Sequence, residues 1–165
     1  MGIRDQAEQV VKLGGHANAW AMAVSLEAQR LQSPRTRDEQ FVDCYLLVLA
    51  LRQVIRSAEA MHKAVGGDPQ LKHAQDQFLA EYPEAARMRD VLSHFDEYEA
   101  GQGRLQKSGE VGAINIFFST GPTSVILSLA SNLTIELSTA APSAVALAEA
   151  TVDAQQRYLE GQRGW

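Results

Sequence analysis

The spacing of apolar residues changes twice along this chain of 165 residues. Up to about residue 100 they recur every three or four positions, which is the period of a helix that buries one face. Between residues 113 and 139 they alternate with polar residues, which is the period of a half-buried strand. From residue 142 the helical period returns. This pattern predicts a mainly helical α+β protein.

The first part of the chain is expected to contain four helices. Residues that favour turns or helix starts separate them, namely Ser33-Pro34, the sequence Gly-Gly-Asp-Pro at 66–69, and Pro83. Apolar residues on one side of each segment predict helices over residues 4–31, 37–65, 70–81 and 83–100. Residues 1–100 are therefore expected to form a four-helix bundle-like core, which is followed by a glycine-containing loop over residues 101–112.

The alternating segment is expected to form a small sheet. Turn-forming residues at 121–122 and 131–132 divide it into three short strands, which predicts an antiparallel meander over residues 113–139. Pro142 is expected to start a C-terminal helix over residues 142–161 that covers the meander. The length suits one compact core, so we expect a single domain over residues 1–165.

Composition excludes several classes of protein. The net charge of −5 argues against a broad basic surface for nucleic acid. The single cysteine, Cys44, lies in an apolar run, so we expect it to be buried and to bind no zinc. No cofactor and no metal are expected. The sequence shows neither a signal-peptide pattern nor an apolar stretch long enough to span a membrane, which predicts a cytoplasmic protein.

The stretch RMRDVLSHFDEY, residues 87–98, carries the clearest chemical signal. On a helix its apolar residues form a stripe that faces the core: Met88, Val91, Leu92 and Phe95. Arg89, Asp90 and His94 then face outward, and Asp90 lies one turn from His94, so that the two could meet. A histidine can exchange a proton with an RNA hydroxyl near neutral pH, while a guanidinium stabilises the charged phosphate of the transition state. These residue types favour metal-free RNA cleavage, for which a two-fold dimer would supply a second Arg–His pair.

Arg89, followed by Asp90, three further residues and His94, resembles the signature motif of the HEPN superfamily. That motif is an arginine, usually followed by Asn, Asp or His, and a histidine after four to six intervening residues. Members are commonly dimeric, metal-independent endoribonucleases, often toxins paired with an antitoxin or parts of phage defence. The resemblance covers about residues 4–98 and implies that Arg89 and His94 are catalytic and that Asp90 orients or polarises. It also implies a homodimer that acts on single-stranded RNA, with an antitoxin or regulatory protein as a partner.

Two other interpretations stay open. Outward Arg, Asp and His side chains are also typical of a solvated helix face, in which case the chain is a non-catalytic binding or regulatory module. Its partner would then meet a helix face or an exposed strand edge. Separately, Glu59 and His62 have the Glu-x-x-His spacing of di-iron helical proteins, although a complete site needs a second such pair and two further glutamates.

Overall fold

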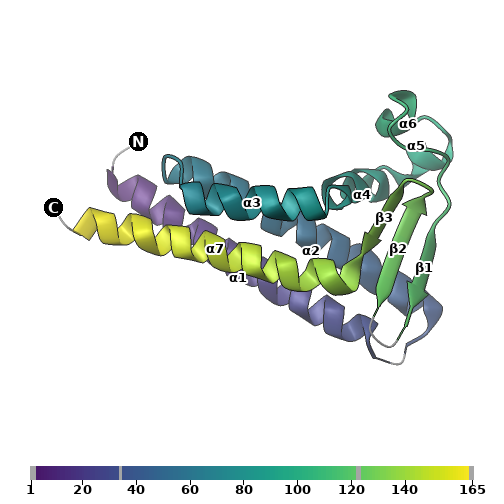
Figure 1. The fold of residues 1–165 in the computed structure, drawn as a ribbon, viewed down its shortest axis with the longest axis horizontal. Coiled ribbons are helices and arrows are strands. Elements are labelled where there is room, and N and C mark those ends of the chain that lie inside the picture. The colour runs from purple at the N-terminus through teal and green to yellow at the C-terminus, as the bar shows by residue number, and fades with distance from the viewer. Residues whose placement is uncertain (1–2, 34, 122–123, 164–165) are drawn as a thin grey trace.

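The computed structural model describes residues 3–33, 35–121 and 124–163 (Figure 1). Three long helices pack side by side along much of their lengths: α1 (Ile3–Leu31), α2 (Arg37–Ala64) and α7 (Leu137–Arg163). The shorter helix α3 (Pro69–Glu81) packs on α2 and α7, and α4 (Glu84–Ser93) packs on α2 near the sheet. The expected mainly helical α+β fold is confirmed.

Local sequence signals explain where two of these helices begin. Thr36 caps α2, since its hydroxyl oxygen accepts a hydrogen bond from the backbone N–H of Glu39. The Glu39 carboxylate accepts a bond from the Thr36 N–H in return, at 2.9 Å. Asp68 caps α3 by accepting a bond from the Leu71 N–H at 2.8 Å. The two glycines at 66–67 have φ angles of 77° and 97°, a conformation that favours glycine and turns the chain between α2 and α3.

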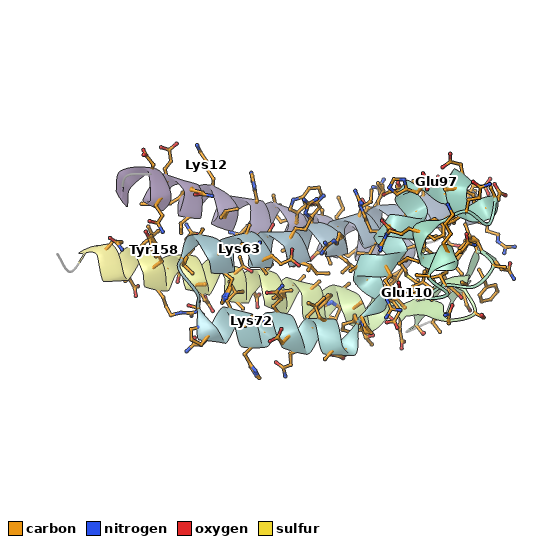
Figure 2. All side chains as sticks on the ribbon, turned by 90° about the horizontal axis from the view of Figure 1, so that it is seen from above. Lys12, Lys63, Lys72, Glu97, Glu110 and Tyr158 are labelled. Atoms are coloured by element: carbon orange, nitrogen blue, oxygen red, sulfur yellow. The ribbon has the colours of Figure 1, made fainter. Side chains whose placement is uncertain are left out.

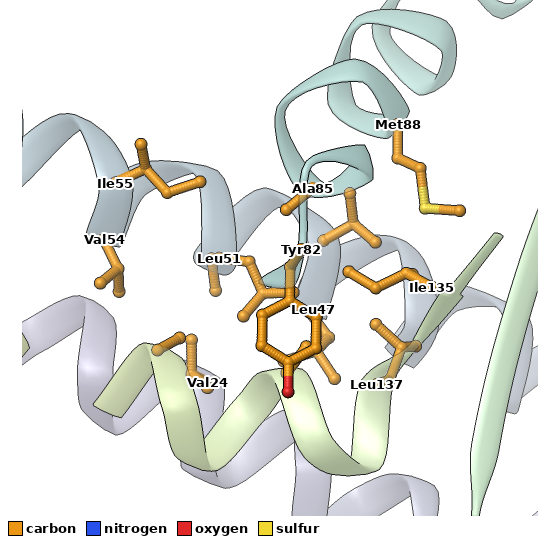
Figure 3. Packing of buried hydrophobic residues seen from close by; sticks show 14 of the residues in the cluster. Val24, Leu47, Leu51, Val54, Ile55, Tyr82, Ala85, Met88, Ile135 and Leu137 are labelled. Atoms are coloured by element: carbon orange, nitrogen blue, oxygen red, sulfur yellow. The ribbon is translucent and has the colours of Figure 1, made fainter. Parts of the chain in front are cut away.

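The hydrophobic core is centred on the side chains of α2 (Figure 3). Leu47, Leu51, Val54 and Ile55 of α2 lie among Val24 of α1, Tyr82, Ala85 and Met88 of the α3–α4 region, and Ile135 and Leu137 from the sheet end. Leu47 and Leu51 are fully buried, so shortening either to alanine is expected to cost about 2–5 kcal/mol of stability. The core therefore extends from the long helices to the sheet without interruption.

The sheet is the expected antiparallel meander, in the order β1-β2-β3. Its strands are β1 (Phe117–Thr120), β2 (Val125–Ala130) and β3 (Leu133–Glu136). Phe118 pairs with Leu127, and Leu127 pairs with Ile135, so the apolar residues share the face that packs on the core. The first strand begins at Phe117, later than expected, although the preceding isoleucines still pack against the core. Pro122 of the first expected turn lies outside the described residues.

The C-terminal helix begins earlier than expected. α7 starts at Leu137, directly after β3, and Pro142 lies inside it. Pro142 has no N–H to donate to the Ser138 carbonyl, a loss that burial of Leu137, Ala140 and Ala141 in the first turns offsets. α7 packs mainly along α1 and α2 and touches the sheet near its start. It is therefore a member of the helical bundle, not a separate cover for the meander. The C-terminal Trp165 lies outside the described residues.

Candidate functional site

Helix α4 carries the first part of the Arg–His stretch. Its apolar side chains Met88, Val91 and Leu92 are buried, and α4 packs on α2, as the helical spacing predicted. Arg89 is half-buried, and Asp90 is half-buried beside it. The core stripe is therefore confirmed for α4, and the polar side chains lie at the surface edge of this helix.

The expected continuous helix over residues 83–100 is wrong, because the chain leaves helical geometry at His94. α4 ends at Ser93, and a separate short helix, α5 (Phe95–Glu99), follows. His94 has φ −126° and ψ 37°, and its backbone N–H lies 3.2 Å from the Asp90 carbonyl oxygen. Helical spacing therefore does not set the position of side chains beyond Ser93.

A buried tyrosine explains this break. Tyr98 is 1% exposed, and its hydroxyl donates a hydrogen bond to Oδ2 of Asp90 at 3.0 Å. In a continuous helix these two residues would be separated by about 12 Å along the axis, which is too far for this contact. The same hydroxyl accepts a hydrogen bond from the Leu105 N–H at 3.2 Å. Forming both bonds requires α5 to turn back toward α4.

Residues that were expected to form a loop complete this corner. The short helix α6 (Arg104–Lys107) interrupts residues 101–112, and Nη2 of Arg104 lies 3.4 Å from Oδ2 of Asp90. Gly103 packs so closely on the Tyr98 ring that an added Cβ would lie 2.2 Å from a ring carbon. Burial raises the pKa of the Tyr98 hydroxyl, and the Asp90 carboxylate raises it further, which keeps the hydroxyl a donor. We call Asp90, Tyr98 and Arg104 the Asp90 cluster.

His94 and Arg89 are not part of that cluster. The His94 side chain is 51% exposed, and its Nδ1 lies 3.5 Å from Oε1 of Glu97. Within the described residues, the anticipated contact between the side chains of Asp90 and His94 is not formed, and the Arg89 side chain makes no hydrogen bond or ion pair. The structure thus places Arg89, Asp90 and His94 on one short stretch of surface, without joining them in a hydrogen-bonded group.

The surroundings of His94 carry both signs of charge. Asp96, Glu97 and Glu99 on α5 are all exposed, and Figure 2 shows Glu97 at the opposite end of the molecule from Tyr158. Two arginines supply positive charge: Arg87 lies seven positions before His94 in the sequence, and Arg104 lies 3.4 Å from the Asp90 carboxylate. A bound phosphate would therefore be attracted by guanidinium groups and repelled by the carboxylates of α5.

The alternative metal ligands Glu59 and His62 have other partners, and Cys44 is buried. Oε1 of Glu59 lies 3.6 Å from Nη1 of Arg52, and Nδ1 of His62 lies 3.2 Å from both the backbone N and O of Asp68. Across residues 3–33, 35–121 and 124–163, no three His, Cys, Asp or Glu side chains gather closely enough to hold a metal ion. Cys44 is fully buried, and this burial raises its pKa to about 12, so its thiol is not ionised at neutral pH.

The sequence analysis did not predict a cluster of buried charged residues that lies between α1 and α2. Glu27 is 7% exposed and Asp43 is 3% exposed. Arg30 lies 3.1 Å from the Glu27 carboxylate and 3.8 Å from that of Asp43, and Arg35 lies 3.6 Å from Asp43. Pairing of these charges is what permits their burial. The spacing of Glu27 from buried Val24 was a usable signal, because three positions along a helix lie on the same face.

No family model, curated protein or solved structure matches this chain. Among the described residues, no helix combines the length and the apolar character needed to cross a membrane. The functional inference therefore depends on the geometry of the chain itself.

Proposed function

We propose that this chain is a HEPN-like, metal-independent endoribonuclease that acts on single-stranded RNA as a homodimer, through Arg89 and His94. The observation that carries the proposal is that both side chains have nitrogen atoms free to contact a substrate near the α4–α5 junction. Within the described residues the Arg89 guanidinium has no partner, and His94 meets its acidic partner through Nδ1, which leaves Nε2 for a substrate. Arg104 also balances the charge of Asp90, the acidic residue next to Arg89.

The proposed reaction is an internal transesterification that needs no cofactor. Nε2 of His94 accepts the proton of an RNA 2′-hydroxyl, whose oxygen then attacks the adjacent phosphorus. The bond from phosphorus to the 5′-oxygen breaks, and this oxygen takes a proton from the partner subunit's His94. Arg89 stabilises the negative charge that develops on the phosphate oxygens. The products are a 2′,3′-cyclic phosphate and a 5′-hydroxyl.

Two carboxylates have supporting roles in this proposal. Glu97 lies beside Nδ1 of His94, which favours the tautomer with hydrogen on Nδ1 and leaves Nε2 as the base. Asp90 acts indirectly, because its hydrogen bond to Tyr98 stabilises the chain turn at which His94 lies. Asp90 is thus a positioning residue that works through the backbone of the α4–α5 junction.

Cleavage of a mixed single-stranded RNA pool in EDTA tests the proposal. Relative to the native protein, His94→Ala is expected to cleave about 100-fold more slowly or worse, as for loss of a general acid and base. Arg89→Ala is expected to lose about 100-fold or more, since it removes charge stabilisation. His73→Ala on α3 and Arg56→Ala on α2 are matched controls, because both side chains are exposed and lie on other helices, and both variants should cleave at the native rate. Intact RNA at high native protein concentration, or equal cleavage by all variants, would refute the nuclease.

A non-catalytic binding or regulatory module is the second candidate. It is favoured by the acidic side chains of α5, Asp96, Glu97 and Glu99, which oppose the approach of a phosphate to His94. This candidate predicts that the native protein neither cleaves nor binds single-stranded RNA at physiological ionic strength. A binding measurement with a 2′-O-methyl oligonucleotide, which lacks the attacking hydroxyl, separates the two candidates without relying on turnover.

A further inference from the structure

A groove runs between α1 and α7, and among the described residues no other helix lines its two main cavities. Two cavities meet there and share Ser25, Val145 and Glu149. The cavity that Met22 and Leu26 also line has a volume of about 570 Å³. A third cavity continues the groove toward the sheet and shares Pro142 with the first. We define the α1–α7 groove by Met22, Ser25 and Leu26 of α1 and Pro142, Val145 and Glu149 of α7.

The α1 wall of the groove is apolar and unusually exposed. Met22 is 73% exposed and Leu26 is 53% exposed, and they lie one turn apart on the same side of α1. Small residues lie deeper in the groove, including Ala21 and Ala28, so a helix could approach the backbone closely. The groove spans about 21 Å from Asn18 to Gln32, which is about four turns of a helix.

Helix α3 covers α7 on the side away from the groove. In Figure 1, α3 lies along one side of α7, while α1 crosses behind α7 and appears on its other side toward the sheet. α3 has 13 residues, and its buried residues Leu71, Gln75 and Phe78 recur at positions i, i+4 and i+7. The groove beside α1 has the length for a helix of similar size, with three anchoring residues at the same spacing.

The charge of the groove indicates which polar residue that helix should carry. Glu149 lines both cavities and is exposed, and its side chain forms no ion pair or hydrogen bond within the described residues. The whole chain has a net charge of −5, which also favours a basic partner. The remaining rim residues include Asn18 and Gln29, which are neutral and can both donate and accept hydrogen bonds.

We propose that the α1–α7 groove binds an amphipathic helix of about four turns from another protein. That helix presents apolar residues at i, i+4 and i+7 to Met22, Leu26 and Val145, and a lysine or arginine to Glu149. The docking site lies on α1 and α7, whereas the candidate nuclease residues belong to α4 and the α4–α5 junction. The proposal is therefore independent of whether this chain cleaves RNA.

Selection from a displayed library of randomised helices, each about 14 residues long, tests the docking site with the full chain as bait. Selected helices are expected to share three apolar residues at i, i+4 and i+7 and one basic residue at a fixed offset. The affinity of one synthetic selected peptide is then measured by fluorescence anisotropy. Leu26→Glu should weaken binding about tenfold or more. Val42→Glu is the matched control, because Val42 is also an exposed apolar helix residue, 53% exposed on α2 outside the groove, and it should leave affinity unchanged.

A charge exchange tests the pairing with Glu149. Repeating the selection with Glu149→Lys as bait should replace the basic residue of the peptide by Asp or Glu, while keeping the apolar spacing. Selections without a common helical pattern, or a peptide bound equally by Leu26→Glu, would overturn the proposal. Light scattering tests whether a second copy of this chain occupies the groove instead. A native dimer that Leu26→Glu converts to a monomer, while Val42→Glu stays dimeric, would also overturn it.

Discussion

The hydroxyl of Tyr98 lies 3.0 Å from Oδ2 of Asp90 and so connects the two sides of the helix break at His94. It also accepts the backbone N–H of Leu105 at 3.2 Å, so one buried oxygen holds α4, α5 and α6 together. The break at His94 is what allows Tyr98 to reach Asp90, so the bond and the break depend on each other.

Replacing Tyr98 with phenylalanine removes that oxygen and keeps the ring. We expect the free energy of unfolding to fall by about 1–3 kcal/mol, because the buried Leu105 N–H loses its acceptor. Urea unfolding followed by circular dichroism measures the change. Tyr45→Phe is the control, since the Tyr45 hydroxyl forms no hydrogen bond within the described residues. An equal effect of both substitutions would contradict the assignment.

Asp68 is expected to make stability depend on pH in acid. Hydrogen bonds from Arg157, at 2.9 and 3.0 Å, and from the Leu71 N–H hold the pKa of Asp68 below its usual value. A carboxylate whose pKa is lower in the folded state stabilises the fold above its unfolded pKa of about 4, and this contribution is lost as the pH falls toward the folded value. Asp68→Asn keeps the helix cap and removes the charge.

Urea unfolding between pH 7 and pH 3 tests this prediction. The native protein should be more stable than Asp68→Asn by a constant amount near neutral pH, and the difference should shrink below about pH 4. Asp76→Asn, which removes an exposed ion pair with Lys72 on the same helix, should show a much smaller difference throughout. A pH-independent difference for Asp68→Asn would mean that its charge does not contribute.

Two glycine substitutions are expected to have opposite effects. Gly15 lies inside α1, and nothing lies within 4 Å of an added Cβ, so Gly15→Ala should stabilise the protein by about 0.5–1 kcal/mol. Gly103→Ala would place a Cβ 2.2 Å from the buried Tyr98 ring and should destabilise by about 1–3 kcal/mol. Thermal unfolding measures both. A rise in Tm for Gly103→Ala would show that the corner can rearrange.

Cys44 is expected to resist alkylation in the native protein. Burial and the neighbouring Asp43 raise its pKa to about 12, and its side chain has no exposed surface. Iodoacetamide at pH 8 should therefore label Cys44 quickly in urea and hardly at all in buffer, as measured by mass spectrometry. Rapid stoichiometric labelling of the native protein would show that α2 opens locally.

Several elements could be predicted because their signals are local. Thr36 with Glu39, and Asp68 before Pro69, mark helix starts through bonds to nearby backbone groups. The three strands follow from alternation and turn residues, which need no knowledge of distant contacts. The burial of Met88 and Val91 likewise follows from helical spacing within α4.

Other features depend on contacts between distant residues. Leu137 continues the alternation of Leu133 and Ile135, yet it also lies at helical spacing from Ala141, so its pattern fits a strand and a helix equally. The break at His94 requires the bond between Tyr98 and Asp90, which no local propensity encodes. Arg89 and His94 could be nominated from their order along the chain. The pairing of Arg104 with Asp90 could not, because it joins residues on opposite sides of that break.

β3 passes into α7 with no intervening residue, since Glu136 ends the strand and Leu137 begins the helix. No loop lies between them, so the direction of β3 fixes the direction in which α7 leaves the sheet. α4 packs against β3, and the α1–α7 groove lies along α7. The β3–α7 joint therefore connects the surface that carries Arg89 to the wall of the groove through continuous secondary structure.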